Sequence, residues 1–165
     1  MNYNVETILI YTILAGILSI VYGYFTGKNI LNSSAGNSKM QEIAEAIQIG
    51  AKAYLNRQYK TIAIVGVVVL VIVSFSFSIL VGLGYLVGAT LSGIAGYVGM
   101  LVSVQANVRT AEASRKGLAE GLSVAFKSGA VTGMLVAGLA LLAIAVYYFL
   151  LLKFEVNEIE IVNAL

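Results

Sequence analysis

The chain has 165 residues, of which 59% are hydrophobic and 11% are charged, and its formal net charge is +2. A soluble domain carries about a quarter charged residues because its surface must meet water, so this composition excludes an ordinary water-soluble fold. The sequence contains no cysteine, histidine or aspartate. Disulfides, thiolate metal sites and catalysis by these side chains are therefore excluded.

Three long segments of the sequence lack any charge, and they lie between Glu6 and Lys28, between Lys60 and Arg109, and between Lys127 and Lys153. A helix needs about 20 apolar residues to cross the hydrocarbon core of a bilayer. The first and third segments each fit one such helix, and the middle segment fits two helices joined by a turn near Gly82 to Gly88.

Helices are the expected spanning elements, because backbone groups in lipid need internal partners and no alternation of the β-barrel type is present. We therefore predict an all-α membrane protein with four transmembrane helices in one multi-pass segment, residues 1–165. The predicted spans cover residues 7–27, 61–81, 86–108 and 128–152.

Nine of the ten basic residues fall in two segments, one between the first and second spans and one between the third and fourth. Cytoplasmic segments of membrane proteins carry an excess of Lys and Arg. This rule places both segments in the cytoplasm and both termini on the non-cytoplasmic side. The predicted localisation is an integral multi-pass membrane protein, in the inner membrane if the cell is bacterial.

Both cytoplasmic segments are predicted to be helical extensions of the spans. Apolar residues recur at helical spacing from Lys39 to Tyr59, and charged residues form one stripe at helical spacing from Val108 to Phe126. The first segment has five basic and two acidic residues, and the second has four and two. Membrane orientation alone requires this excess, so we expect no nucleic-acid partner.

Small residues indicate where membrane helices pack, because they let two backbones approach closely. In the third and fourth spans the predicted packing residues are Ser92, Gly96, Gly99, Ser103, Gly129 and Gly133. The first span carries a similar set of Ser19, Gly23 and Gly27. The second span is rich in valine, so we expect it to face lipid most and the third span to be the most enclosed. Tyr97 lies in the middle of the third span and should face another helix, where its hydroxyl finds a partner.

No predicted span contains an acidic or basic side chain, although such residues are the usual functional candidates in pumps and transporters. Neither a catalytic triad nor a Walker phosphate loop is present. The predicted sets of catalytic, cofactor-binding and metal-binding residues are therefore empty. We expect Arg57 and Arg109 to be membrane-interface anchors. The remaining cytoplasmic acids are predicted to be solvated partners of Lys and Arg, namely Glu42, Glu45, Glu112 and Glu120.

Two blocks of the sequence match a known family in their order and spacing. The first runs from Met40 to Tyr59, and the second runs from Gly88 to Met100 and continues from Ala106 to Ala111. They resemble the N-terminal portion, the first four spans, of the membrane-bound inorganic pyrophosphatases that translocate H⁺ or Na⁺. The likeness covers nearly the whole chain, with a departure at Ile49, where the family usually has Glu.

The resemblance implies that the chain is the outer-ring, N-terminal part of a longer pump that couples pyrophosphate hydrolysis to H⁺ or Na⁺ translocation. Family members work as homodimers, and their Asp-rich motifs for pyrophosphate and Mg²⁺ begin at the fifth span, which the chain up to Leu165 does not include. No catalytic residue is carried over, and the chain alone is predicted to be inactive. The implied partners are the remainder of the pyrophosphatase chain, a second copy and the lipid bilayer.

The alternative is a stand-alone four-span protein, either a membrane scaffold or a small transporter subunit. A small multidrug exporter depends on a membrane-buried glutamate in its first span, and this chain has none there after Glu6. The scaffold is therefore the stronger form of this alternative.

Overall fold

The computed structural model describes residues 4–165 as four long helices and one short helix. They are α1 (Val5–Leu31), α2 (Ser38–Ser76), α3 (Ile79–Ser114), α4 (Leu118–Lys153) and α5 (Glu158–Ala164). Each of the four long helices is long and apolar enough to cross a membrane. No strand occurs in residues 4–165. The predicted all-α membrane fold with four spanning helices is confirmed.

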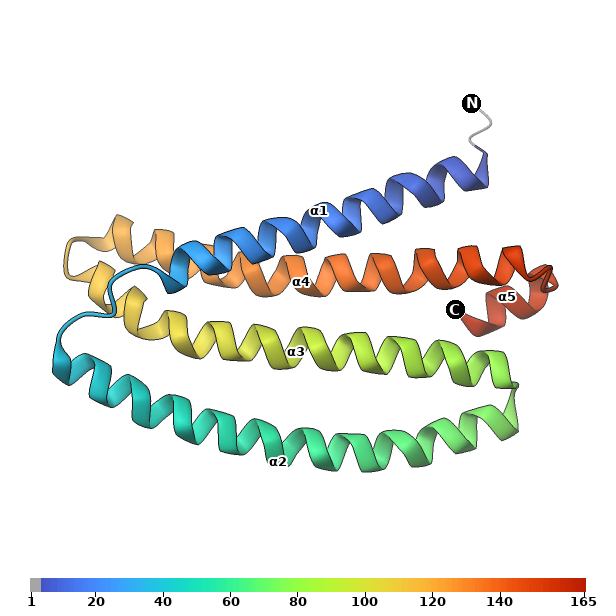
Figure 1. The fold of residues 1–165 in the computed structure, drawn as a ribbon, viewed down its shortest axis with the longest axis horizontal. Helices are drawn as coiled ribbons and strands as arrows, with labels where there is room; N and C mark the ends of the chain where they lie inside the picture. Colours follow the sequence, from blue (N-terminus) through green and yellow to red (C-terminus); the bar gives the residue numbers. More distant parts are fainter. Residues whose placement is uncertain (1–3) are drawn as a thin grey trace.

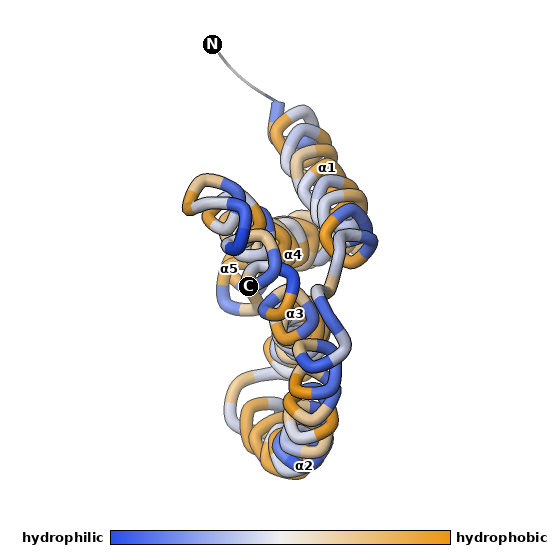
Figure 2. Tube along the Cα trace, turned by 90° about the vertical axis from the view of Figure 1, so that its left-hand side faces the viewer, coloured by the Kyte–Doolittle hydropathy of each residue, from blue (hydrophilic) through white to orange (hydrophobic). Residues whose placement is uncertain are grey.

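The four long helices form a single row in the order α1, α4, α3, α2 (Figure 1). Neighbours in the row are antiparallel, and α5 folds back against α3 and α4 at one end (Figure 1). The view along the helices in Figure 2 shows that the row is about one helix thick. Both broad faces of the row are therefore open, and the buried core consists of small clusters between adjacent helices.

The connections 32–37 and 115–117 lie at one end of the row, and the α2–α3 turn and α5 lie at the other (Figure 1). The end that carries the connections 32–37 and 115–117, together with the adjoining ends of the helices, is called the charged end, because the basic segments of the sequence adjoin it. The first basic segment continues without a break into the second span, since α2 begins at Ser38 and ends at Ser76. This continuity confirms the first predicted helical extension.

The second predicted extension is interrupted, which corrects the expectation of one helix from Val108 to Phe126. α3 ends at Ser114, and α4 begins at Leu118. Gly117 between them has a φ of +156°, a backbone conformation that favours glycine. The charged stripe read from the sequence is therefore divided between two antiparallel helices.

The turn between the second and third spans lies at Phe77 and Ser78, so its predicted position near Gly82 to Gly88 is wrong. The side-chain oxygen of Ser78 accepts a hydrogen bond from the backbone N–H of Val81 at 3.2 Å, which caps the start of α3. Gly82 lies inside α3 with its Cα facing the side chain of Ser74, where a Cβ would collide. This glycine serves the close approach of α2 and α3 next to the turn.

The second span is the least enclosed, as predicted, because none of its most apolar 18-residue stretch is buried. The prediction that the third span is the most enclosed is wrong. The corresponding stretch of α3 is 11% buried, against 22% for α1 and 17% for α4. α3 packs less extensively on α2 than on α4, so its side toward α2 stays partly open.

Candidate functional site

The structure brings two of the six predicted packing residues against a neighbouring helix. A Cβ built on Gly99 would lie 2.8 Å from Cγ2 of Thr132 on α4, and a Cβ on Gly96 would lie 2.6 Å from the hydroxyl of Tyr59 on α2. The two glycines therefore allow close contacts on both sides of α3.

The other four predicted packing residues are less involved in the described part of the chain. Ser103 is half-buried, whereas Ser92, Gly129 and Gly133 are exposed. A Cβ on Gly129 or Gly133 would meet nothing within 4 Å. The packing role of these residues stays a prediction, and it would require contacts with a partner other than residues 4–165.

Among the glycines of the spans, Gly16 of α1 and Gly138 of α4 come closest to the backbone of another span, and the sequence did not single them out. A Cβ on Gly16 would lie 3.0 Å from the carbonyl oxygen of Gly138, and a Cβ on Gly138 would lie 2.8 Å from that of Gly16. The small residues predicted to pack in the first span, Ser19, Gly23 and Gly27, are all buried. Gly16 extends their stripe by one helical turn, and this spacing was the signal that could have identified it.

Tyr97 faces another helix, as predicted. Its hydroxyl donates a hydrogen bond of 2.9 Å to Oδ1 of Asn56 on α2. Its ring meets that of Tyr59 edge to face, with centroids 5.2 Å apart and an interplanar angle of 81°. Polar and aromatic contacts therefore join α2 to α3 where α2 enters its predicted span.

Arg109 joins α3 to α1 at the charged end. Its Nε and Nη2 atoms donate to the carbonyl oxygen of Leu31 at 3.1 and 2.7 Å, and its Nη1 atom donates to that of Gln105 at 2.7 Å. Leu31 is the last residue of α1, where carbonyl groups lack helical partners and carry partial negative charge. The half-buried guanidinium therefore caps α1, and the predicted role of Arg109 as a membrane-interface anchor stays a prediction.

A polar pocket of about 450 Å³ is partly lined by Arg109, and its other polar lining residues are Ser33, Ser34, Glu112, Lys116, Glu120 and Ser123. The α1–α2 connection approaches α3 closely here. Gly36 has a φ of +80°, and a Cβ on it would lie 3.0 Å from Oε2 of Glu112. A glycine is thus required on both conformational and steric grounds.

Two of the four predicted ion-pairing glutamates have basic partners. Glu42 pairs with Lys39 at 3.0 Å, and Glu112 pairs with Arg115 at 3.1 Å, each within one helix. Glu45 makes no ion pair within residues 4–165, and the same holds for Glu120. The pairing prediction is confirmed for Glu42 and Glu112 alone.

The described residues do not fit a magnesium and pyrophosphate site. Mg²⁺ bound to phosphates is held by carboxylate oxygens. In residues 4–165, no three side chains of the Asp, Glu, His or Cys type lie together as metal ligands. The polar pocket combines two acidic with two basic residues, which leaves no excess of ligands for a cation. The contacts at this end position helices, and no chemical step is assigned to them.

Known proteins resemble this chain over most of its length. A family model described as inorganic H⁺ pyrophosphatase matches residues 17–165. A K⁺-insensitive pyrophosphate-energized proton pump of Methanosarcina mazei is 48% identical over 83% of this chain and 21% of its own length. A protein with the same description from Caldanaerobacter subterraneus is 38% identical over 85% of this chain and 22% of its own.

Another relative has a different ion in its description. A putative K⁺-stimulated pyrophosphate-energized sodium pump of Bacteroides thetaiotaomicron is 39% identical over 83% of this chain and 20% of its own length. The chain thus spans about a fifth of the length of these curated relatives. The family match covers far more than half of the chain. The chain belongs to the inorganic H⁺ pyrophosphatase family of membrane pumps.

Proposed function

We propose that this chain forms a peripheral, non-catalytic part of a pump that couples pyrophosphate hydrolysis to the translocation of H⁺ or Na⁺. The relatives, which are described as pyrophosphate-energized pumps, support the coupled reaction. The open row of helices is the observation that supports the peripheral, non-catalytic role. A row one helix thick leaves both of its broad faces to be covered by lipid or by further helices (Figure 2).

Exposed apolar side chains at the charged end support a protein partner. Leu118 is 78% exposed and Phe126 is 75% exposed, and both lie on the first turns of α4. This segment adjoins the basic residues that the positive-inside rule places at the cytoplasmic surface, where exposed apolar groups mark contact sites. We assign the covering surface to the remainder of the pump chain.

The transported ion is either H⁺ or Na⁺, since relatives described as proton pumps and as sodium pumps match the chain with 48% and 39% identity. The pump is proposed to use Mg²⁺, which would neutralise the phosphate charges of the substrate. Because residues 4–165 do not fit such a site, the ligands are assigned to the rest of the pump. The complete pump is proposed to act as a homodimer, as the resemblance to the family implies.

A chimaera tests the proposed role. This chain would replace the matched segment of the Methanosarcina mazei relative, and pyrophosphate-driven acidification of inverted membrane vesicles would be measured with a pH-sensitive dye. We expect the chimaera to retain pumping, because a peripheral segment from the same family should preserve the packing of the catalytic helices. A well-inserted, stable chimaera with hydrolysis but no pumping would place the coupling machinery inside this segment and overturn the proposal.

The isolated chain provides the complementary experiment. Purified in detergent, it should release no phosphate from pyrophosphate with Mg²⁺ above background, because its spans contain no acidic or basic side chains and its glutamates do not gather. The unmodified relative, purified in the same way, is the positive control. Phosphate release by the isolated chain would contradict the non-catalytic assignment.

A further inference from the structure

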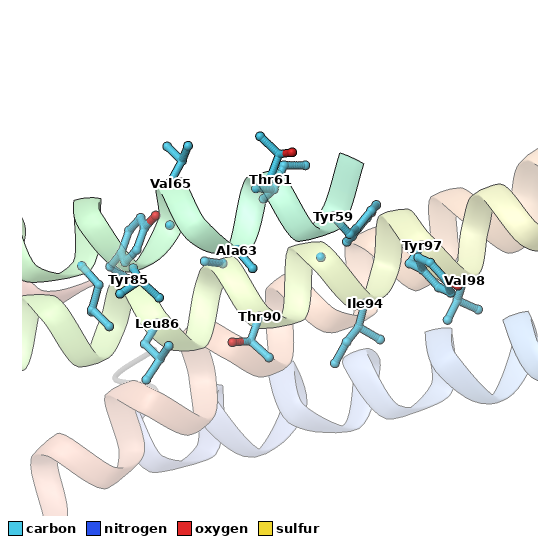
Figure 3. Close-up of a pocket in the computed structure, with 16 residues that line it drawn as sticks. Tyr59, Thr61, Ala63, Val65, Tyr85, Leu86, Thr90, Ile94, Tyr97 and Val98 are labelled. Atoms are coloured by element: carbon cyan, nitrogen blue, oxygen red, sulfur yellow. The ribbon is translucent and has the colours of Figure 1, made fainter. Parts of the chain in front are cut away.

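An apolar groove of about 870 Å³ runs along α2 and α3. Its walls are formed by one side of α2 between Tyr59 and Leu70 and one side of α3 between Tyr85 and Val98. Figure 3 shows Tyr85 toward one end of the groove and Tyr59 and Tyr97 toward the other. The interior wall residues between these tyrosines are aliphatic or small, apart from two threonines.

The length of the groove matches one leaflet of a bilayer. From Tyr59 to Leu70, α2 advances by 11 residues, which at about 1.5 Å per residue is about 16 Å. The hydrocarbon core of a bilayer is about 30 Å thick, so one leaflet contributes about 15 Å. An acyl chain that enters at the Tyr59 end would therefore reach the other end near the middle of the membrane.

The Tyr59 end of the groove carries positive charge. Lys60 follows Asn56 by four residues and precedes Ala63 by three, so these three residues share one face of α2. Asn56 bonds Tyr97 and Ala63 lines the groove, so Lys60 lies between them on the same face of α2, next to the lining residues Tyr59 and Thr61. Lys52 lies one turn further along the same face, and residues 46–111 contain no acidic residue. Lys60 is exposed and makes no ion pair within residues 4–165.

We propose that this groove binds an anionic phospholipid, with one acyl chain along α2 and α3 and the headgroup phosphate at Lys60. The apolar walls match the acyl chain, and the acid-free basic face matches the phosphate. The amide nitrogen of Asn56 is a further donor to the headgroup, because Tyr97 engages only the amide oxygen.

Another helix fits the groove less well than a lipid does. A helix would have to supply an acidic group at the level of Lys60, whereas the phosphate of an anionic lipid lies at that level by nature.

Fluorescence quenching by brominated lipids tests the proposal. Residues 1–165 contain no cysteine, so Thr90→Cys, made in a background free of any other cysteine, provides one labelling site in the groove for a bimane dye. Nanodiscs would contain phosphatidylcholine together with brominated phosphatidylglycerol or brominated phosphatidylcholine. We expect the groove probe to report about fivefold tighter binding of phosphatidylglycerol, since one Lys near the surface contributes about 1 kcal/mol. In a Lys60→Gln background this preference should disappear.

Two matched controls separate the site from the general lipid annulus. Ile64→Cys places the dye at a similar depth on α2 but outside the groove, and it should report no preference between the two lipids. Lys127→Gln removes an exposed basic residue from α4 at the charged end and should leave the preference at residue 90 unchanged.

Equal quenching by the two lipids at residue 90 would overturn the proposal. If neither lipid quenched the probe, the proposal would also be overturned. Such a result would mean that a helix of the pump or a second copy covers the groove. Native mass spectrometry of the protein without cysteine substitutions provides a second measurement. Retained phosphatidylglycerol should be lost from Lys60→Gln but kept by Lys127→Gln, and identical lipid retention in the two variants would contradict the assignment.

Discussion

Arg109 and Leu31 are 78 residues apart in the sequence, yet two guanidinium nitrogens of Arg109 donate hydrogen bonds to the carbonyl oxygen of Leu31. The contact fixes the end of α1 to α3, although α1 packs along its length on α4. It closes the row at the charged end, where the α1–α2 connection begins.

Replacement of Arg109 by alanine is expected to lower the free energy of unfolding by about 2–3 kcal/mol, because charged hydrogen bonds to a half-buried carbonyl are lost. Thermal unfolding in detergent measures the effect. Arg115→Ala is the control, since its side chain is 61% exposed and its ion pair with Glu112 should contribute at most about 1 kcal/mol. Equal destabilisation by the two variants would show that Arg109 does not cap α1.

The Tyr97 hydroxyl provides a second stability test. Tyr97→Phe keeps the ring contact with Tyr59 and removes the bond to Asn56, so we expect a loss of about 0.5–1.5 kcal/mol. Tyr54→Phe is the matched control, because Tyr54 is 62% exposed and its hydroxyl forms no hydrogen bond within residues 4–165. In the Asn56→Ala background, Tyr97→Phe should cost less than it does in the unsubstituted chain. A cost that is the same in both backgrounds would exclude coupling between the two residues.

The number of spanning helices could be predicted from the sequence because charges are costly in lipid, and the uncharged segments therefore indicate the spans directly. The position of the α2–α3 turn could not be predicted in the same way. Glycine favours both turns and close helix contacts, and at Gly82 it serves the contact with Ser74. The turn depends instead on the cap at Ser78, a short signal within an apolar segment.

Which small residues form helix contacts depends on which helix lies next to them, and this arrangement cannot be read from the sequence. The regular spacing in the fourth span pointed to Gly129 and Gly133, but the crossing with α1 occurs at Gly138. The role of Arg109 was missed for a related reason. Its acceptor is a backbone carbonyl at the end of another helix, and any residue at position 31 would present that group.

Cysteine labelling tests the membrane orientation. The positive-inside rule predicts this orientation, and the arrangement of the helices does not determine it. Cysteines at Asn37 and Ser114 should react with an impermeant reagent from the cytoplasmic side, and cysteines at Asn4 and Asn157 from the opposite side. All four positions are exposed, so a failure to react would not result from burial within the chain. Labelling of Asn4 and Ser114 from the same side would contradict the four-span arrangement.

Three glycines test which helix contact is the tightest, because alanine adds one Cβ atom at each. Gly16→Ala would place that atom 3.0 Å from the backbone of α4, which cannot move alone, so we expect a loss of about 1–3 kcal/mol. At Gly96 the nearest atom is the hydroxyl of Tyr59, the end of a flexible side chain, and the cost should be smaller.

Gly129→Ala is the control in this series, since an added Cβ meets nothing within 4 Å. Alanine favours helix over glycine by up to about 1 kcal/mol, so this variant should be as stable as the unsubstituted chain or slightly more stable. Thermal unfolding of the three variants in the same detergent ranks their stabilities directly. If Gly129→Ala destabilised the chain as much as Gly16→Ala, a second copy would have to pack on the exposed face of α4, and the crossing of α1 and α4 would not be the tightest contact.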